Sequence, residues 1–198
     1  MKRIIIGLTG PTGSGKSSAA KAALDMGVQV IDCDVTARRA SARGSRGLAL
    51  LKKEFGNEII NPDGSLNRKK LAGIAFSCPE NTERLNRTLL PIIAELIKQE
   101  IASDRVLLDA PTLFESGVDS MCNDTVAVLS DVSVRRKRII ARDNLTIEEA
   151  NARISAGKSD DFYIKRAGHI LFNNDDFDGY MSNAKKIFEN LFGGNINV

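Results

Sequence analysis

The sequence predicts an α/β fold in which a mainly parallel sheet is flanked by helices, and three observations support this. Short apolar runs of single-strand length recur along the chain. Stretches with apolar residues at helical spacing separate these runs. Turn signals rich in glycine or proline, such as Asn61-Pro62-Asp63-Gly64, mark several boundaries. Strands that alternate with helices indicate βαβ units, which build parallel sheets.

The apolar runs and the helical spacing give an expected position for each element. The strands are expected at residues 4–8, 28–31, 106–110, 125–129 and 169–172. The helices are expected at residues 16–26, 46–55, 132–142, 146–155 and 176–192, and residues 67–103 are expected to be mostly helical. Thr146 and Glu149 match a capping box. Pro91 is expected to break or kink its helix near Leu90.

Length, charge and composition limit the kinds of protein that this chain can be. The 198 residues suit a single domain, residues 1–198, of ordinary size. The 28 Lys and Arg exceed the 25 Asp and Glu by only 3, too few to predict a nucleic-acid partner. The single histidine, His169, argues against a histidine-rich metal site. No segment approaches the roughly 18 apolar residues of a membrane span.

The cysteines indicate a reducing compartment. Cys33, Cys78 and Cys122 are an odd number, lie far apart and form no CxxC pair. Free thiols of this kind are typical of cytoplasmic proteins. We therefore expect a cytoplasmic protein. We also expect it to act without a membrane, as a monomer or a weak homo-oligomer.

Residues 10–17, which read GPTGSGKS, fit the phosphate-binding pattern GxxxxGK[ST] between an expected strand and an expected helix. Glycines let backbone N–H groups surround anionic oxygens, and the following helix adds partial positive charge. Lys16 is expected to reach the β- and γ-phosphates, and Ser17 to hold Mg²⁺. The sequence therefore predicts a P-loop NTPase fold that binds ATP with Mg²⁺.

Other features of the sequence argue against two kinds of P-loop protein, the GTPases and the ATPase motors. Asn173-Asn174-Asp175-Asp176 lacks the lysine of the guanine-reading pattern NKxD, and no DxxG switch follows a strand at a suitable place. The chain is also short for an ATPase motor. Small P-loop kinases remain.

Acidic residues follow two of the expected strands. Asp32 and Asp34 end the second strand, where a carboxylate can act as the base for an acceptor hydroxyl. The alternative is that one or both cap the next helix. Asp109 ends a hydrophobic strand like a Walker B aspartate and is a candidate for holding Mg²⁺, with Glu115 near the same edge.

A basic helix precedes the capping box. Arg138 and Arg142 share one helix face, and we expect both to contact phosphates as part of a lid over about residues 138–165. For Arg135 and Arg136, a solvated helix face is an equally good interpretation. Arg153 is expected to pair with Glu149, four residues before it. The helical block at about residues 60–103 is expected to form a substrate-binding region.

Several segments together resemble the dephospho-coenzyme A kinase family over residues 4–174. They are GLTGPTGSGKS at 7–17, VIDCD at 30–34, DGSLNRKKLAGIAF at 63–76, DAPTLFE at 109–115 and RIIARDNLTIEEANARI at 138–154. The resemblance implies transfer of the ATP γ-phosphate to the ribose 3′-hydroxyl of dephospho-coenzyme A. It implies that Asp34 is the base, Arg68 lies on the acceptor side, Arg142 faces the ATP phosphates and Asn173 lies near the adenine.

The expected sites can then be stated in full. The ATP-binding residues are expected to be Gly10, Pro11, Thr12, Gly13, Ser14, Gly15, Lys16, Ser17, Ser18, Arg138, Arg142 and Asn173. The acceptor-binding residues are expected to be Asp34, Arg68, Pro111, Leu113 and Glu115, and the metal ligands Ser17 and Asp109. Asp34, Lys16 and Arg142 are the expected catalytic residues.

The chain departs from the family pattern at a few positions. Leu90 stands where the family usually has histidine, Gly157 replaces a lid glutamine, and Gly168 replaces an aspartate. Thr112 stands where the family usually has leucine. The missing histidine and glutamine keep open the alternative of a nucleotide-binding regulator without transferase activity. A kinase for another nucleoside or small alcohol is a further alternative.

Overall fold

A computed structural model describes residues 3–174 and 176–193; the rest of the expected 1–198 domain lies outside the described residues. The strands are β1 (Ile4–Thr9), β2 (Gln29–Asp32), β3 (Arg105–Asp109), β4 (Asp124–Leu129) and β5 (His169–Phe172). They form one five-stranded sheet in the order β2-β3-β1-β4-β5, and every strand pair is parallel. The prediction of a parallel α/β sheet is confirmed.

The described helices follow the expected alternation. They are α1 (Lys16–Asp25), α2 (Cys33–Ala40), α3 (Arg46–Phe55), α4 (Arg68–Ala75), α5 (Pro79–Glu100), α6 (Val132–Asp143), α7 (Ile147–Ser155), α8 (Asp160–Ile164) and α9 (Phe177–Leu191). The capping box of α7 is confirmed, because Thr146 accepts from Glu149 N–H and Glu149 accepts from Thr146 N–H. The sequence did not predict the short helix α8, and it indicated α2 only through the alternative in which Asp32 or Asp34 caps a helix.

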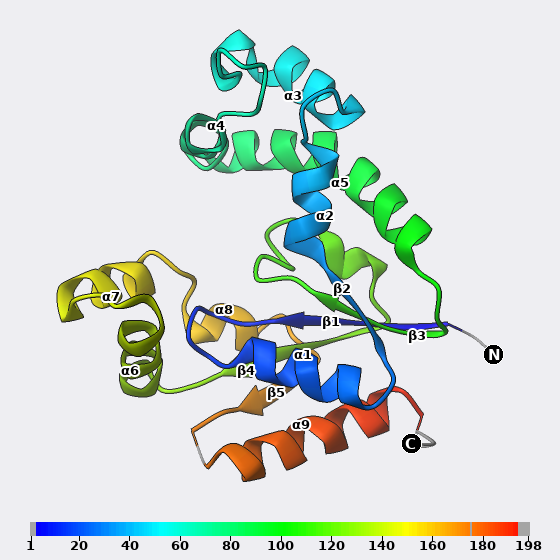
Figure 1. Ribbon diagram of the computed structural model, residues 1–198, viewed down its shortest axis with the longest axis vertical. Coiled ribbons are helices and arrows are strands. Elements are labelled where there is room, and N and C mark those ends of the chain that lie inside the picture. Colours follow the sequence, from blue (N-terminus) through cyan, green and yellow to red (C-terminus); the bar gives the residue numbers. More distant parts are fainter. Residues whose placement is uncertain (1–2, 175, 194–198) are drawn as a thin grey trace.

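Pro91 was expected to break or kink its helix near Leu90, and the helix does not break there. Helix α5 continues through Pro91 to Glu100. Its ribbon changes direction part-way along its length (Figure 1). Proline removes one helical hydrogen bond and crowds the preceding turn, which bends a helix without ending it when packing holds both halves. Ile93 and Ile97 supply such packing, since both are buried against the sheet.

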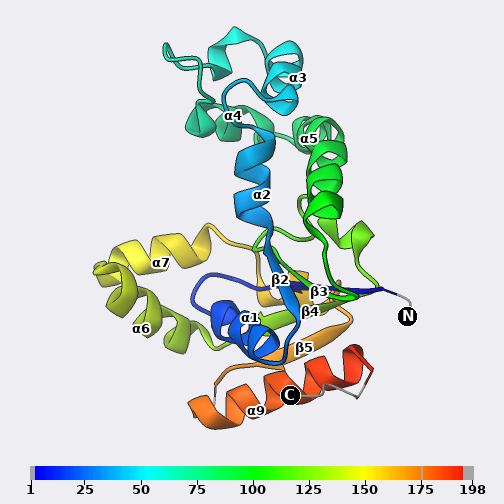
Figure 2. The same ribbon diagram turned by 45° about the vertical axis from the view of Figure 1, so that its right-hand side comes forward.

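Helices cover both faces of the sheet (Figure 1). Helices α1 and α9 pack on one face, where Ala19, Ala23, Phe188 and other apolar residues meet the strands. Helices α2 and α5 pack on the opposite face. Helices α3 and α4 with the first part of α5 extend away from the sheet, whereas α6 and α7 project on another side (Figure 2). The chain thus has a sheet-centred body from which helices rise on two sides.

The parallel arrangement gathers the functional segments. Every strand ends at the same edge, so the turn after β1, the start of α2, the segment after β3, and Asn173 after β5 all lie there. Ligands of open α/β sheets bind at this edge. Within the described ranges, no helix has the length and hydrophobicity that a membrane span requires.

Candidate active site

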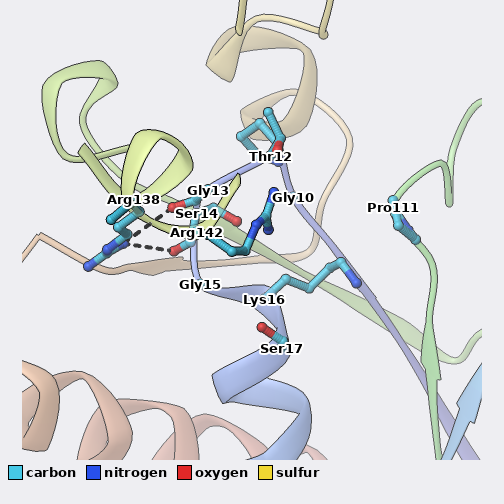
Figure 3. Close-up of a pocket in the computed structure, with 12 residues that line it drawn as sticks. Gly10, Thr12, Gly13, Ser14, Gly15, Lys16, Ser17, Pro111, Arg138 and Arg142 are labelled. Atoms are coloured by element: carbon cyan, nitrogen blue, oxygen red, sulfur yellow. Dashed lines mark hydrogen bonds between the residues drawn. The ribbon is translucent and has the colours of Figure 1, made fainter. Parts of the chain in front are cut away.

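A cavity of about 730 Å³ opens where β1 turns into α1. Its wall consists of Gly10, Pro11, Thr12, Gly13, Ser14, Gly15, Lys16, Ser17, Pro111, Arg138, Ala141 and Arg142. In Figure 3 the Lys16 side chain extends across this space toward the segment that carries Pro111. The residues of the predicted phosphate loop therefore line one side, and α6 supplies the other. Ala141 carries no polar group and gave no signal in the sequence.

Side chains from α6, from α9 and from the segment after β5 hold the carbonyl groups of the loop. Arg138 donates to Gly13 O at 3.4 Å and to Ser14 O at 3.3 Å (Figure 3). Asn173 Nδ2 donates to Ser14 O at 2.7 Å, and Tyr180 donates to Gly15 O at 2.9 Å. These donors occupy the carbonyls of Gly13, Ser14 and Gly15. The loop's N–H groups can then turn toward the cavity, apart from Ser14 N–H, which donates to Pro11 O at 3.2 Å.

Two glycines of the loop have no room for a side chain. Gly10 has φ +149°, and a Cβ there would lie 2.4 Å from Val128 O. Gly15 has φ +98°, and a Cβ there would lie 2.0 Å from Nδ2 of Asn173. These contacts explain in physical terms why the pattern requires glycine at these positions.

Lys16 forms an ion pair with Asp109 at the end of β3, and each side chain is only 17% exposed. Burial raises the pKa of Asp109, while the Lys16 ammonium group opposes that rise. The charges of Asp32 and Asp34 act in the same direction as burial. Carboxylates from the ends of β2 and β3 therefore lie near one another, and that of Asp109 contacts the lysine of the phosphate loop.

Asp32 and Asp34 have different roles in the local structure. Asp32 caps α2, because Oδ1 accepts from Asp34 N–H at 2.9 Å and from Val35 N–H at 3.1 Å. The capping alternative therefore holds for Asp32. Asp34 occupies the first turn of α2 with its side chain exposed. Its carboxylate is thus available to a ligand at the sheet edge.

A second cavity of about 400 Å³ adjoins the first and shares Gly10, Pro11, Thr12 and Pro111 with it. The remaining wall residues are Thr112, Glu115, Arg153, Ala156, Gly157, Lys158 and Tyr163. Tyr163 is a buried residue that sequence reasoning missed, because α8 itself was not predicted. The two cavities thus adjoin along the first residues of the phosphate loop and Pro111.

Arg142 lines the first cavity but is held at its rim by Asp143. Arg142 donates to both Asp143 carboxylate oxygens at 2.8 Å, which lowers the pKa of Asp143. Arg153 also pairs with Asp143. The expected pair of Arg153 with Glu149 is therefore wrong, because Glu149 is engaged in the capping box.

Several expected site residues lie outside both cavities. Leu113 is fully buried in the core, Arg68 donates to Ser41 Oγ at 3.2 Å, and Ser18 lies within α1. Asn173 is buried behind the loop. The structure thus brings the loop, Pro111, Glu115, Arg138 and Arg142 to the cavity walls, with Asp34 and Asp109 at the adjoining strand ends.

Comparison with known proteins agrees with this geometry. The family model described as Dephospho-CoA kinase matches residues 4–178. A dephospho-CoA kinase of Staphylococcus aureus strain Mu50 is 33% identical over 93% of this chain and 92% of its own length. The chain belongs to the dephospho-CoA kinase family. The resemblance noted in the sequence is confirmed.

Solved structures show the same fold. TT1252 from Thermus thermophilus has a TM-score of 0.76 and 33% identity, covering 94% of this chain and 96% of that one. A dephospho-CoA kinase from Campylobacter jejuni has a TM-score of 0.63 and 23% identity, covering 96% and 98%. This second likeness shows the fold, which is that of P-loop kinases as predicted.

The departures from the dephospho-CoA kinase pattern fall in different surroundings. Leu90 is half-buried against the core on the α5 side of the sheet. Gly157 lines the second cavity. A Cβ at Gly168 would lie 2.0 Å from Asp124 Oδ1, so a larger residue there requires Asp124 to move. Thr112, the remaining departure, also lines the second cavity, so Gly157 and Thr112 are the two that border a candidate ligand site.

Glu115 gives the second cavity a pH-dependent group. Its Oε2 is buried and has no hydrogen-bond partner within the described part of the chain. Burial raises the pKa of Glu115 above its ordinary value of 4.5, although Lys158 and Arg166 oppose the rise. A carboxyl with a raised pKa binds its proton more tightly when folded, so the free energy of unfolding falls as pH rises through that range.

Replacing Glu115 by glutamine is therefore expected to raise the melting temperature at about pH 8 and to raise it less at about pH 5. Glutamine keeps the shape but removes the buried charge. Thermal unfolding of the ligand-free protein at both pH values measures the effect. Glu95→Gln, at an exposed position on α5, is the control. An equal gain at both pH values would contradict the prediction.

Proposed function

We propose that the protein transfers the γ-phosphate of ATP to the ribose 3′-hydroxyl of dephospho-coenzyme A, giving coenzyme A and ADP. The observation that carries the proposal is a pair of adjoining cavities that share residues of the phosphate loop as a wall. ATP occupies the first cavity with its phosphates on the loop. The acceptor approaches from the side of Asp34 and Glu115. Family membership supports this choice of acceptor.

The proposed transfer balances in one step. Asp34 accepts the proton of the 3′-hydroxyl as its oxygen bonds to the γ-phosphorus, and the bond from that phosphorus to the ADP oxygen breaks. Lys16, released from Asp109 toward the phosphates, and Arg142, released from Asp143, neutralise charge on the transferring group. In the structure, each of these two cations is paired with a carboxylate.

Mg²⁺ belongs to the proposal through the donors near the loop. The Ser17 hydroxyl lines the first cavity, and Asp109 stands opposite Lys16. These are hard oxygen ligands, which suit Mg²⁺ together with phosphate oxygens and water. The described residues contain no group of three or more acidic, histidine or cysteine side chains for a metal alone. When bound with ATP, Mg²⁺ supplies neutralisation of phosphate charge.

Without Mg²⁺, the rate of phosphoryl transfer is accordingly expected to fall to the background rate of the assay. A coupled assay for ADP release, run with ATP and dephospho-coenzyme A with and without EDTA, measures this. The same assay with a panel of nucleosides and small alcohols tests the choice of acceptor. A faster reaction with a nucleoside would support the alternative kinase function. ATP binding without transfer to any acceptor would support the regulatory alternative.

The reaction is proposed to take place in the cytoplasm. Cys33, Cys78 and Cys122 are all free, which suits a compartment that keeps thiols reduced. The oligomeric state is proposed to be a monomer or a weak homo-oligomer. Helix α6, which lines the first cavity, and helices α7 and α8, which line the second, are proposed to act as the lid. Residues 60–103 are proposed to contribute to acceptor binding.

A further inference from the structure

Arg135 is buried on the side of α6 that faces the phosphate loop. Its side chain is only 3% exposed, so the solvated alternative for this residue is wrong. A charged side chain is rarely buried to this degree unless it has partners. Arg135 has two: its Nε donates to Thr12 O at 3.2 Å, and its Nη1 donates to Asp160 Oδ1 at 3.0 Å.

The loop packs directly on α6 at this residue. A Cβ on Gly13 would lie 2.9 Å from Arg135 O and 3.0 Å from Ile139 Cγ1. Thr12 lines both cavities, so its position affects the walls of each. Arg135 therefore fixes the tip of the loop, whereas Arg138, Asn173 and Tyr180 hold the carbonyls that follow.

Asp160 begins α8 on the far side of α7 in the sequence. Its pair with Arg135 joins the chain after α7 to the helix that precedes α7. Tyr163, three residues further along α8, is buried and lines the second cavity. A single guanidinium thus links the tip of the phosphate loop to the helix that borders the second cavity.

We propose that Arg135 is a positioning residue that holds the Thr12 carbonyl outward, turning the loop's N–H groups toward the phosphates of ATP and tying α8 to the loop. The inference rests on the proposed function, since ATP is the ligand whose binding it describes. Arg135 acts through the loop and not by touching the nucleotide. Asp160 keeps the guanidinium in place by pairing with its second nitrogen.

The test compares Arg135→Met with Lys137→Met, an exposed position on the same helix. Methionine keeps length and packing but removes both hydrogen bonds. Loss of a hydrogen bond made by a charged group predicts roughly 10- to 100-fold weaker ATP binding by calorimetry. In the kinase assay, KM for ATP should rise by a similar factor while kcat changes less than about fivefold. Lys137→Met should leave both constants unchanged.

A merely structural role gives a different result. It would lower the melting temperature and the active fraction, hence kcat, and leave KM and the ATP dissociation constant of the folded protein unchanged. That outcome would overturn the proposal. If Arg135→Met does not fold, Asp160→Asn serves, because its side chain is 40% exposed. That variant should weaken ATP binding severalfold, and an affinity within twofold of the unaltered protein would refute the role of the pair.

The unaltered chain separates failure of this inference from failure of the proposed function. Calorimetry that shows no ATP binding by the unaltered chain would overturn both. ATP binding that is equal in the unaltered chain and in Arg135→Met would overturn only the inference.

Discussion

The Asp34→Asn variant should turn over about 10²–10⁴-fold more slowly than the unaltered protein, with ATP affinity nearly unchanged. Asparagine has the same shape but cannot accept the proton of the acceptor hydroxyl. Asp34 is exposed in the first turn of α2, and Asp32, not Asp34, makes the capping hydrogen bonds. The substitution therefore removes a base without removing a structural contact. Single-turnover kinetics with saturating ATP and acceptor measure the loss.

Asp32→Asn is the matched control for this prediction. Asparagine caps helices as well as aspartate does, so α2 should remain intact. The control variant should keep turnover within about tenfold of the unaltered protein. A larger loss in Asp32→Asn than in Asp34→Asn would move the base to Asp32. Near-normal turnover in Asp34→Asn would remove the assignment altogether.

Lys16→Met is expected to lower kcat by about 10²–10³-fold and also to weaken ATP binding, because it removes a cation aimed at the transferring phosphate. Lys16 lines the first cavity, and among the residues that the structure describes its carboxylate partner is Asp109. Lys21→Met, at an exposed position on the same helix, should leave both constants unchanged. Equal activity in the two variants would contradict the role of Lys16.

The same variant has a pH-dependent effect on stability. Without Lys16, the charge of Asp109 is left partly buried and unpaired, which raises its pKa further. The folded state then gains stability from protonation as pH falls toward the ordinary aspartate range. The loss in melting temperature should therefore be larger at about pH 8 than at about pH 5. A loss that is larger at the lower pH would contradict this account of the pair.

The fold and the phosphate loop could be predicted because their signals are local. Each strand is a short apolar run, and the loop residues from Gly10 to Ser17 are contiguous, so their spacing alone implies the cradle. The strand order could not be derived from the runs. It follows from which neighbours pair, and β3 lies between β1 and β2 although it comes much later in the chain.

The layer of side chains behind the loop was the hardest part to predict. Arg135 and Ile139 lie four residues apart on one face of α6, and both are buried. An isoleucine at that spacing marks a buried face, but arginine is usually exposed, so the pattern was ambiguous. Asn173 and Leu113 lie in expected site segments, yet one braces the loop and the other packs in the core.

The most direct test of the central claim follows the phosphate itself. ATP labelled at the γ-phosphate is incubated with the protein, Mg²⁺ and dephospho-coenzyme A, and the product is analysed by mass spectrometry and ³¹P NMR. The account predicts one labelled phosphate per product molecule, a monoester on the ribose 3′-hydroxyl. Label that remains in ATP, appears only as inorganic phosphate, or is carried by a different hydroxyl would contradict it.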